Sequence, residues 1–145
     1  MTADIVIRHA NPDDQNVVRA LVQTIADETF GQLFAPSPVP IDDEDWTLSW
    51  LAISDTTIVG VVLTDNEWIS DLWVIDTSRG LGVGKKLLRR AEAEIASRGH
   101  HACRLRVVKS NDRAVQFYLR QDWKIAREFP HEKFHHPMLE MIKSV

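Results

Sequence analysis

The sequence of 145 residues has one cysteine, one tyrosine and no long hydrophobic run. The single cysteine, Cys103, has no partner for an intramolecular disulfide, which excludes a secreted scaffold stapled by such bonds. The longest clearly apolar run, Ile58 to Leu63, is far shorter than the roughly 20 residues of a transmembrane helix. The first five residues contain neither a basic region nor a long apolar stretch, so we expect no signal peptide and a cytoplasmic protein.

A strong charge of either sign is also missing. Seventeen basic and 21 acidic residues give a formal net charge of −4, the wrong sign for a general nucleic-acid binder. A hydrophobic content of 44% and a charged content of 26% are typical of a soluble globular protein. We therefore expect one domain over residues 1–145, with neither nucleic acid nor a membrane as a partner.

Apolar periodicity and turn residues predict the element order β-α-loop-β-β-β-α-β-α-β-β. The predicted strands are Asp4–Arg8, Trp46–Ser54, Thr57–Thr64, Glu67–Ile75, Cys103–Lys109, Trp123–Phe129 and Met138–Lys143. One helix is predicted from the Asn11-Pro12 start to Gly31, a second from Val83 to a cap at Gly99, and a third over Asn111–Gln121. Between the first helix and the second strand, three prolines and an acidic run predict a loop.

This order indicates an α+β fold. Three strands joined by tight hairpins, followed by β-α-β-α-β, imply a mixed, largely antiparallel sheet of about seven strands. Three helices that each have one apolar face would cover both faces of that sheet, which makes an α/β/α sandwich.

Three of the six glycines lie in the segment Arg79–Lys85, between a predicted strand and an amphipathic helix. Glycine allows close approach of a ligand to the backbone, and the N–H groups at a helix N-terminus attract anions. Arg79 and Lys85 add positive charge, so the segment predicts a phosphate or pyrophosphate site; a ligand-free glycine turn is the alternative. The spacing excludes a Walker loop, because Lys86 follows Lys85, and a dinucleotide fingerprint, because the third glycine comes one residue early.

The pattern Arg79-x-x-Gly82-x-Gly84 after a strand ending Leu72-Trp73-Val74 resembles the coenzyme-A pyrophosphate loop of the GNAT acetyltransferase superfamily. The helix that begins at Asn111 and contains Phe117-Tyr118 is similar to that family's later motif. Together the two resemblances cover about residues 67 to 129. Asp122-Trp123 replaces the Gly-Phe common in the family, and Asp76 replaces a common proline. Aspartate tolerates a left-handed turn, so the turn at Asp122 is expected to survive.

The resemblance implies a GNAT-like acyl-CoA N-acyltransferase fold, acetyl-CoA as co-substrate, an amine acceptor, no metal, and a homodimer as the common assembly. It implies that the Val74 N–H polarises the thioester carbonyl and that Tyr118 protonates the departing thiolate. The residues expected to bind coenzyme A are Trp73, Val74, Arg79, Gly80, Leu81, Gly82, Val83, Gly84, Lys85, Asn111, Ala114 and Tyr118.

The base that deprotonates the amine stays open at this point. The candidates are Glu67 and Asp71, which a flat strand would place on one face; solvated surface acids and direct proton loss to water are the alternatives. The family's acceptor loops correspond to Gly31–Asp45, whose acids would attract a cationic amine, and to the histidine-rich Pro130–Pro137. The acceptor is a small-molecule amine, a protein N-terminus or a lysine.

The segment His131-Glu132-Lys133-Phe134-His135 matches the His-Glu-x-x-His signature of zinc hydrolases. That mechanism needs both histidines on one face of a helix, whereas Pro130 and Pro137 enclose the segment between predicted strands. We therefore expect no zinc site. The remaining alternative to an N-acetyltransferase is a catalytically silent acyl-CoA-binding module with a regulatory role.

Overall fold

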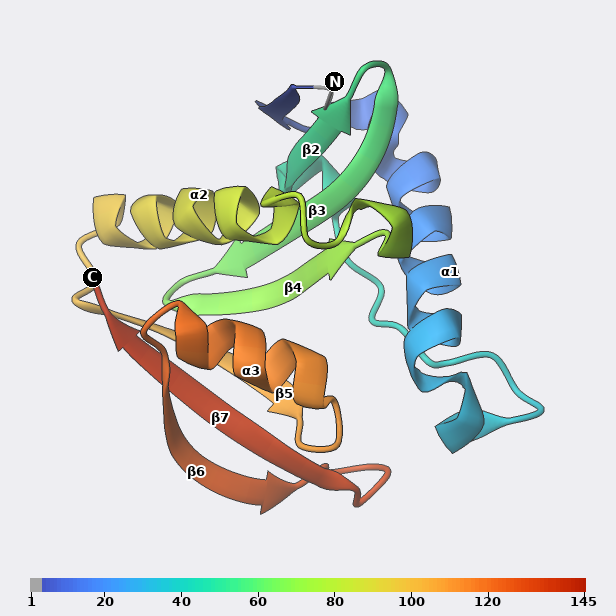
Figure 1. The fold of residues 1–145 in the computed structure, drawn as a ribbon, viewed down its shortest axis with the longest axis vertical. Coiled ribbons are helices and arrows are strands. Elements are labelled where there is room, and N and C mark those ends of the chain that lie inside the picture. Colours follow the sequence, from blue (N-terminus) through green and yellow to red (C-terminus); the bar gives the residue numbers. More distant parts are fainter. Residues whose placement is uncertain (1–3) are drawn as a thin grey trace. The chain divides into compact units, whose positions relative to one another are not determined.

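The computed structural model describes residues 4–145, and Figure 1 labels its elements. The first three residues, on which part of the signal-peptide prediction rests, lie outside the described residues. The strands are β1 (Ile5–His9), β2 (Trp50–Ser54), β3 (Thr57–Asp65), β4 (Trp68–Val74), β5 (Ala102–Val108), β6 (Lys124–Pro130) and β7 (Pro137–Ser144). The helices are α1 (Gln15–Phe34), α2 (Val83–Ser97) and α3 (Asp112–Arg120), with short 3-10 helices η1 (Pro12–Asp14), η2 (Trp46–Leu48) and η3 (Asp76–Ser78).

The strands form a mixed seven-stranded sheet in the order β1-β2-β3-β4-β5-β7-β6. β4 pairs with β5 in parallel, with Trp68 opposite Arg104 and Ile69 opposite Leu105. The pairs β1–β2, β2–β3, β5–β7 and β6–β7 are antiparallel. The predicted α+β class with a largely antiparallel sheet is therefore confirmed.

The chain forms two compact units. Of the described residues, unit 1 contains 4–63 and Asp71–Arg90, and unit 2 contains Thr64–Ser70 and Ala91–Val145. Strand β4 and helix α2 contribute residues to both units. That residues 1–145 make one domain stays a prediction.

In unit 1, helices cover both faces of the sheet because successive strand residues point to opposite sides. Val61 and Leu63 of β3 pack with Val18 and Val22 of α1 in a buried cluster. Gly60 points the other way, where an added Cβ would lie 2.8 Å from Leu87 Cδ1 and 3.2 Å from Val83 Cγ1 of α2. The absence of a side chain at Gly60 lets α2 approach β3 closely, as Figure 1 shows for these two elements.

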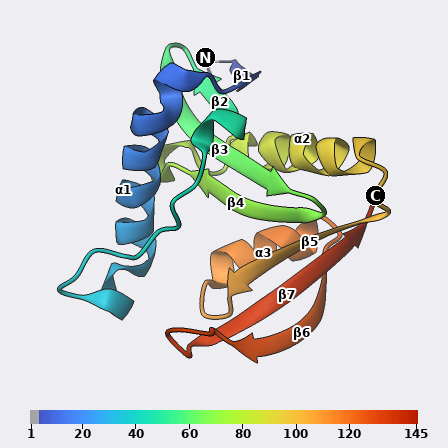
Figure 2. The same cartoon turned by 180° about the vertical axis from the view of Figure 1, so that it is seen from behind.

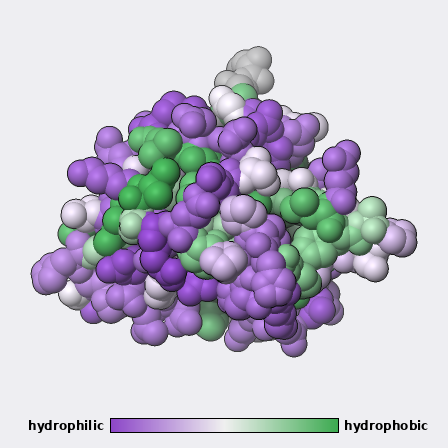
Figure 3. Space-filling view, turned by 90° about the horizontal axis from the view of Figure 1, so that it is seen from below, coloured by the Kyte–Doolittle hydropathy of each residue, from purple (hydrophilic) through white to green (hydrophobic). Residues whose placement is uncertain are grey.

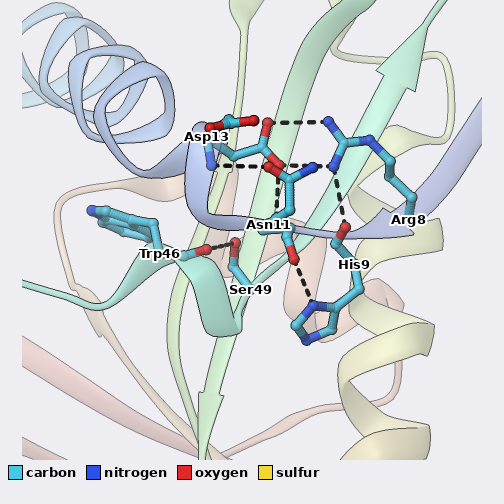
Figure 4. Close-up of polar contacts among 8 residues, drawn as sticks. Arg8, His9, Asn11, Asp13, Trp46 and Ser49 are labelled. Atoms are coloured by element: carbon cyan, nitrogen blue, oxygen red, sulfur yellow. Dashed lines mark hydrogen bonds and ion pairs between the residues drawn. The ribbon is translucent and has the colours of Figure 1, made fainter.

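The predicted helix start at Asn11-Pro12 is the start of the 3-10 helix η1, which leads into α1 at Gln15, and α1 ends later than predicted. Asn11 and Asp14 form a capping box: the Asn11 side chain accepts from the Asp13 N–H at 3.0 Å, and Asp14 Oδ2 accepts from the Asn11 N–H at 2.9 Å (Figure 4). Arg8 Nη1 donates a hydrogen bond to Asp14 Oδ2 at 2.8 Å, and this bond lowers the pKa of Asp14. The predicted stop at Gly31 is wrong, because the helix continues to Phe34. The stop comes at Ala35, which precedes proline and has ψ of 140°, since the residue before proline disfavours the helical region.

The connection from α1 to β2 is held along α1 (Figure 2). The Val39 N–H donates to Asp27 Oδ1 at 2.8 Å, and Gln23 Nε2 donates to the Val39 carbonyl at 2.9 Å. Further on, Gln15 Nε2 donates to the Glu44 carbonyl at 3.0 Å. These bonds fix both ends of the loop that carries the acidic run.

In unit 2, one face of the β5–β7 pair is buried, with Cys103, Leu105 and Met141 among its side chains. The buried Glu92 of α2 accepts hydrogen bonds from Trp123 Nε1 at 3.2 Å and from Lys143 Nζ at 3.0 Å. A buried carboxylate is stable only when it is paired, and here it joins the helix to the sheet. Burial raises the pKa of the Cys103 thiol to about 11, so this cysteine is a core residue rather than a nucleophile.

The surface mixes polar and apolar side chains. Figure 3 shows one face on which hydrophilic side chains separate groups of hydrophobic ones. The exposed large hydrophobic residues come from different elements, among them Leu33, Leu81 and Phe134. Across residues 4–145, no helix is both long and apolar enough to cross a membrane.

Candidate coenzyme-A and acceptor site

The glycine segment in unit 1 leads into the N-terminus of α2. The Lys86 N–H donates to the Gly82 carbonyl at 3.0 Å, which makes Gly82 the residue that caps the helix. Gly80 and Gly82 have φ of +84° and +80°, a left-handed conformation that costs other residues energy. A glycine cap has no side chain that could accept from the next N–H groups, so those of Val83, Gly84 and Lys85 point out from the helix start.

Space and charge at this segment suit an anion. No atom lies within 4 Å of the position that a Cβ would take on Gly80 or Gly82. Arg79 is held by an ion pair to Asp76 at 2.9 Å, and the Lys85 side chain is exposed. The residues present therefore fit a pyrophosphate, which would bind to backbone N–H groups with basic side chains beside it.

The end of β4 in unit 1 brings Asp71 and Trp73 together. Trp73 Nε1 donates to Asp71 Oδ1 at 3.0 Å, and its ring meets Phe30 of α1 edge-on at 6.3 Å. After Val74, which ends the strand, the Ile75 N–H donates to the Val59 carbonyl at 3.0 Å. The predicted binding residues Trp73 and Val74 thus lie at a strand terminus fixed by β3 and α1.

Asp71 belongs to a group of three acids that the sequence did not connect. Burial, together with the neighbouring carboxyls of Glu44 and Asp42, raises the pKa of Asp71 to about 8, although the Trp73 hydrogen bond lowers it. A neighbouring carboxylate favours the protonated form of Asp71, so Asp71 holds a proton near neutral pH.

Glu67 has a different position from the one expected. The prediction placed it at the start of the strand on the same face as Asp71, but it lies in the turn before β4, which begins at Trp68. The turn comes one residue later than predicted and consists of Asn66, with φ of 54°, and Glu67. The Glu67 carbonyl accepts from the Arg104 N–H at 2.9 Å, so its backbone helps to join β4 to β5 in unit 2.

The second motif lies in unit 2 on α3. Asn111 caps the helix, with its side chain accepting from the Ala114 N–H at 3.4 Å. Tyr118 is buried, between Phe117 at 5.3 Å and Trp123 at 6.1 Å between ring centroids. Burial raises the pKa of Tyr118 far above its usual value, which keeps the phenol protonated. After the helix Asp122 has φ of 71°, as predicted for the position where the family has glycine.

The His-Glu-x-x-His segment is a turn between β6 and β7. His135 has φ of 63°, so His131 and His135 do not share a helical face. Within residues 4–145, no group of three or more histidine, cysteine or acidic side chains is placed to hold a metal ion.

Sequence reasoning missed the contact between Glu44 and Asp71. It identified the acidic run as an attraction for a cationic amine, but nothing in the spacing shows which acid reaches β4. The contact depends on the hydrogen bonds that hold the loop along α1. The one available signal was the acidic run itself, in a loop between three prolines and a tryptophan.

Comparison with known proteins assigns the chain to a family. Residues 18–123 match the acetyltransferase (GNAT) family, so the chain is a member of it. A comparison with curated protein sequences gave no match.

Solved structures share the fold at low sequence identity. A GCN5-related N-acetyltransferase from Rhodopseudomonas palustris is 17% identical with a TM-score of 0.79, covering 100% of this chain and 98% of its own. The PaiA N-acetyltransferase from Thermoplasma acidophilum, solved with coenzyme A, is 18% identical with a TM-score of 0.74, covering 98% and 99%. Naa50 from Arabidopsis thaliana, solved with the bisubstrate analogue CoA-Ac-MVNAL, is 16% identical with a TM-score of 0.70, covering 97% and 99%.

Proposed function

We propose that this protein is an N-acetyltransferase that moves an acetyl group from acetyl-CoA directly to a primary amine. The observation that carries the proposal is the start of α2 in a member of the GNAT family. There a glycine cap leaves backbone N–H groups open beside basic side chains. Acetyl-CoA would supply the acetyl thioester, and residues 79–85 would hold its pyrophosphate.

Tyr118 is the proposed general acid. Its buried phenol stays protonated, which is the state needed to give a proton to a leaving thiolate. Asn111 and Ala114, at the start of the same helix, would help to bind coenzyme A. The Val74 N–H would polarise the thioester carbonyl.

Asp71 is the proposed base, in preference to Glu67. An amine arrives as an ammonium ion, and a carboxylate with a pKa of about 8 can take its proton once Asp71 has lost its own. Glu67 lies in the turn before β4 and is not one of the acids that act on Asp71. Asp42 and Glu44 would draw the ammonium ion toward Asp71, which favours a cationic amine as the acceptor.

Release of free thiol from acetyl-CoA, followed across a panel of small amines and peptides, tests the function. Amine-dependent release, accompanied by an acetylated product of matching mass, is the expected result. Binding of acetyl-CoA with no release across the panel would instead support a silent binding module.

Asp43→Asn is a matched control for an Asp71→Asn variant. Asp43 lies in the same acidic run but is exposed and pairs with Arg19 at 2.8 Å. Turnover should fall in Asp71→Asn and remain in Asp43→Asn. Equal loss in both would mean that the loop charge acts as a whole and that Asp71 is not the base.

A further inference from the structure

The connection between β6 and β7, residues 131–136, is closed by its own backbone and by one imidazole. The His131 N–H donates to the His136 carbonyl at 2.8 Å, and the His135 N–H donates to the His131 carbonyl at 2.9 Å. In addition, Nδ1 of His131 accepts from the backbone N–H groups of Lys133 at 3.1 Å and Phe134 at 3.2 Å. The imidazole thus does what an asparagine side chain does in a capped turn.

These two bonds require a particular protonation state. A nitrogen that accepts a hydrogen bond carries no proton, whereas both nitrogens of an imidazolium are donors. The closed turn therefore needs a neutral His131 with its proton on Nε2. Protonation at Nδ1 would leave the Lys133 and Phe134 N–H groups without this acceptor and would point a third donor at them.

Stacking fixes the ring in the orientation that the two bonds need. The His131 ring lies 5.0 Å from Phe134 at an interplanar angle of 28°, and 5.0 Å from His136 at 27°. Burial, followed by the charge of His131, lowers the pKa of His136, so the ring beside His131 favours its neutral form. Two charged rings in this stack would repel each other.

Charged neighbours act on His131 in both directions. The pKa of Glu132 is lowered by a hydrogen bond to its own backbone, followed by the charges of His131, Arg106 and Lys133. This carboxylate therefore stays charged and attracts an imidazolium. Lys133 repels it, as does Arg106 of β5, which pairs with Glu132 at 3.5 Å. The attraction by Glu132 and the repulsion by Lys133 and Arg106 oppose each other. The main effect of protonating His131 on the turn is therefore the loss of Nδ1 as a hydrogen-bond acceptor.

We propose that His131 makes the 131–136 turn sensitive to pH, closed while the imidazole is neutral and opened when it is protonated. Histidine changes charge between about pH 5 and 8, so the turn would respond within the physiological range. The response of the turn is independent of the proposed catalysis. Its consequence for the enzyme, a weaker hold on the amine acceptor at low pH, rests on the proposed function.

Nuclear magnetic resonance of the full chain tests the turn directly. The amide signals of Lys133 and Phe134 are expected to shift with pH in one transition that coincides with the titration of the His131 ring. Their hydrogen-exchange protection should fall about five-fold across that transition, which is the typical effect of losing a capping acceptor.

Two substitutions separate the acceptor from the stacked ring. His131→Asn keeps a side-chain oxygen that accepts from the same N–H groups but does not titrate, so the turn should stay closed and the transition should vanish. His131→Phe keeps the stack without the acceptor, so protection should be low at every pH. His135→Asn is the control, because asparagine tolerates the positive φ of this position and the transition should remain.

Two results would overturn the proposal: a transition that persists in His131→Asn, or amide signals that do not follow the His131 ring in the unmodified chain. Activity is compared afterwards. The KM for the amine should rise at low pH in the unmodified protein but not in His131→Asn, while the KM for acetyl-CoA is unaffected. If the amide result holds and KM does not respond, the pH-sensitive turn stands and its assignment as an acceptor loop fails.

Discussion

At the scale of single residues, two side chains have surroundings that favour the protonated form. Tyr118 is buried among aromatic rings, and Asp71 is buried beside other carboxyls. In each case the charged form loses hydration, and for Asp71 it also meets like charge. In the proposed mechanism, Tyr118 must be protonated before it donates to the thiolate, and Asp71 must be deprotonated before it accepts a proton from the amine.

Tyr118→Phe should lower turnover by about 10²- to 10⁴-fold, the usual contribution of a general acid, with little change in coenzyme-A affinity. The ring is retained, so packing against Trp123 should survive. Steady-state kinetics and calorimetry of the variant measure the two quantities. Undiminished turnover would remove Tyr118 from the mechanism.

Asp71 should make activity rise and stability fall with increasing pH. Its folded pKa of about 8 is above the unfolded value near 3.8, so the folded chain holds a proton that the unfolded chain has lost. The free energy of unfolding contributed by this group therefore decreases as pH rises from about 4 to 8. Asp71→Asn should flatten this decrease and abolish the rise of kcat/KM through about pH 8. Denaturant unfolding at a series of pH values measures how the free energy of unfolding changes with pH. The same pH dependence in Asp71→Asn and in the unmodified protein would contradict the prediction.

At the scale of elements, the sequence predicts those starts and turns that depend on the backbone preferences of single residues. The Asn11-Pro12 start, the place of the glycine segment between a strand and a helix, and the left-handed Asp122 follow from the backbone preferences of single residues. The structure confirms these three local features. Gly31 misled because a glycine inside a helix is tolerated, and the proline after Ala35 is the stronger stop. Glu44 could not be matched to Asp71, because a loop's course depends on tertiary hydrogen bonds.

Gly82→Ala tests the N-terminus of α2. At φ of +80° an added Cβ strains the backbone, so the loop should shift and coenzyme-A affinity should fall roughly ten-fold. Gly31→Ala is the matched control: this glycine lies within α1 with no atom near its Cβ position. That variant should gain about 0.5–1 kcal/mol of stability with unchanged affinity. Equal affinity in both variants, measured by calorimetry, would argue against the loop as the pyrophosphate site.

Gly60→Ala tests the packing of β3 against α2. The added Cβ would lie 2.8 Å from Leu87 Cδ1 and 3.1 Å from the Trp73 carbonyl oxygen, and a backbone atom cannot move aside as a side chain can. Overpacking of this kind costs about 1–3 kcal/mol. Thermal or denaturant unfolding should register that loss, and a variant as stable as the parent would mean that the sheet and helix are less closely packed.

At the scale of the whole molecule, the fold class is the feature that the sequence predicts best. Short hairpins and one β-α-β-α-β stretch predict a mixed, largely antiparallel sheet, and the seven-stranded sheet confirms it. The choice of acceptor is a property of loop side chains that the fold does not fix. A homodimer, a cytoplasmic location and the absence of nucleic-acid and membrane partners stay predictions.

A calorimetric titration of the purified protein with acetyl-CoA, in the presence of a chelator, shows whether the glycine segment binds the co-substrate. Saturable one-to-one binding that needs no metal and that weakens in Gly82→Ala is expected. A flat titration with correctly folded protein would contradict it, because the glycine segment would then be only a turn and the proposed acetyl transfer would lose its substrate.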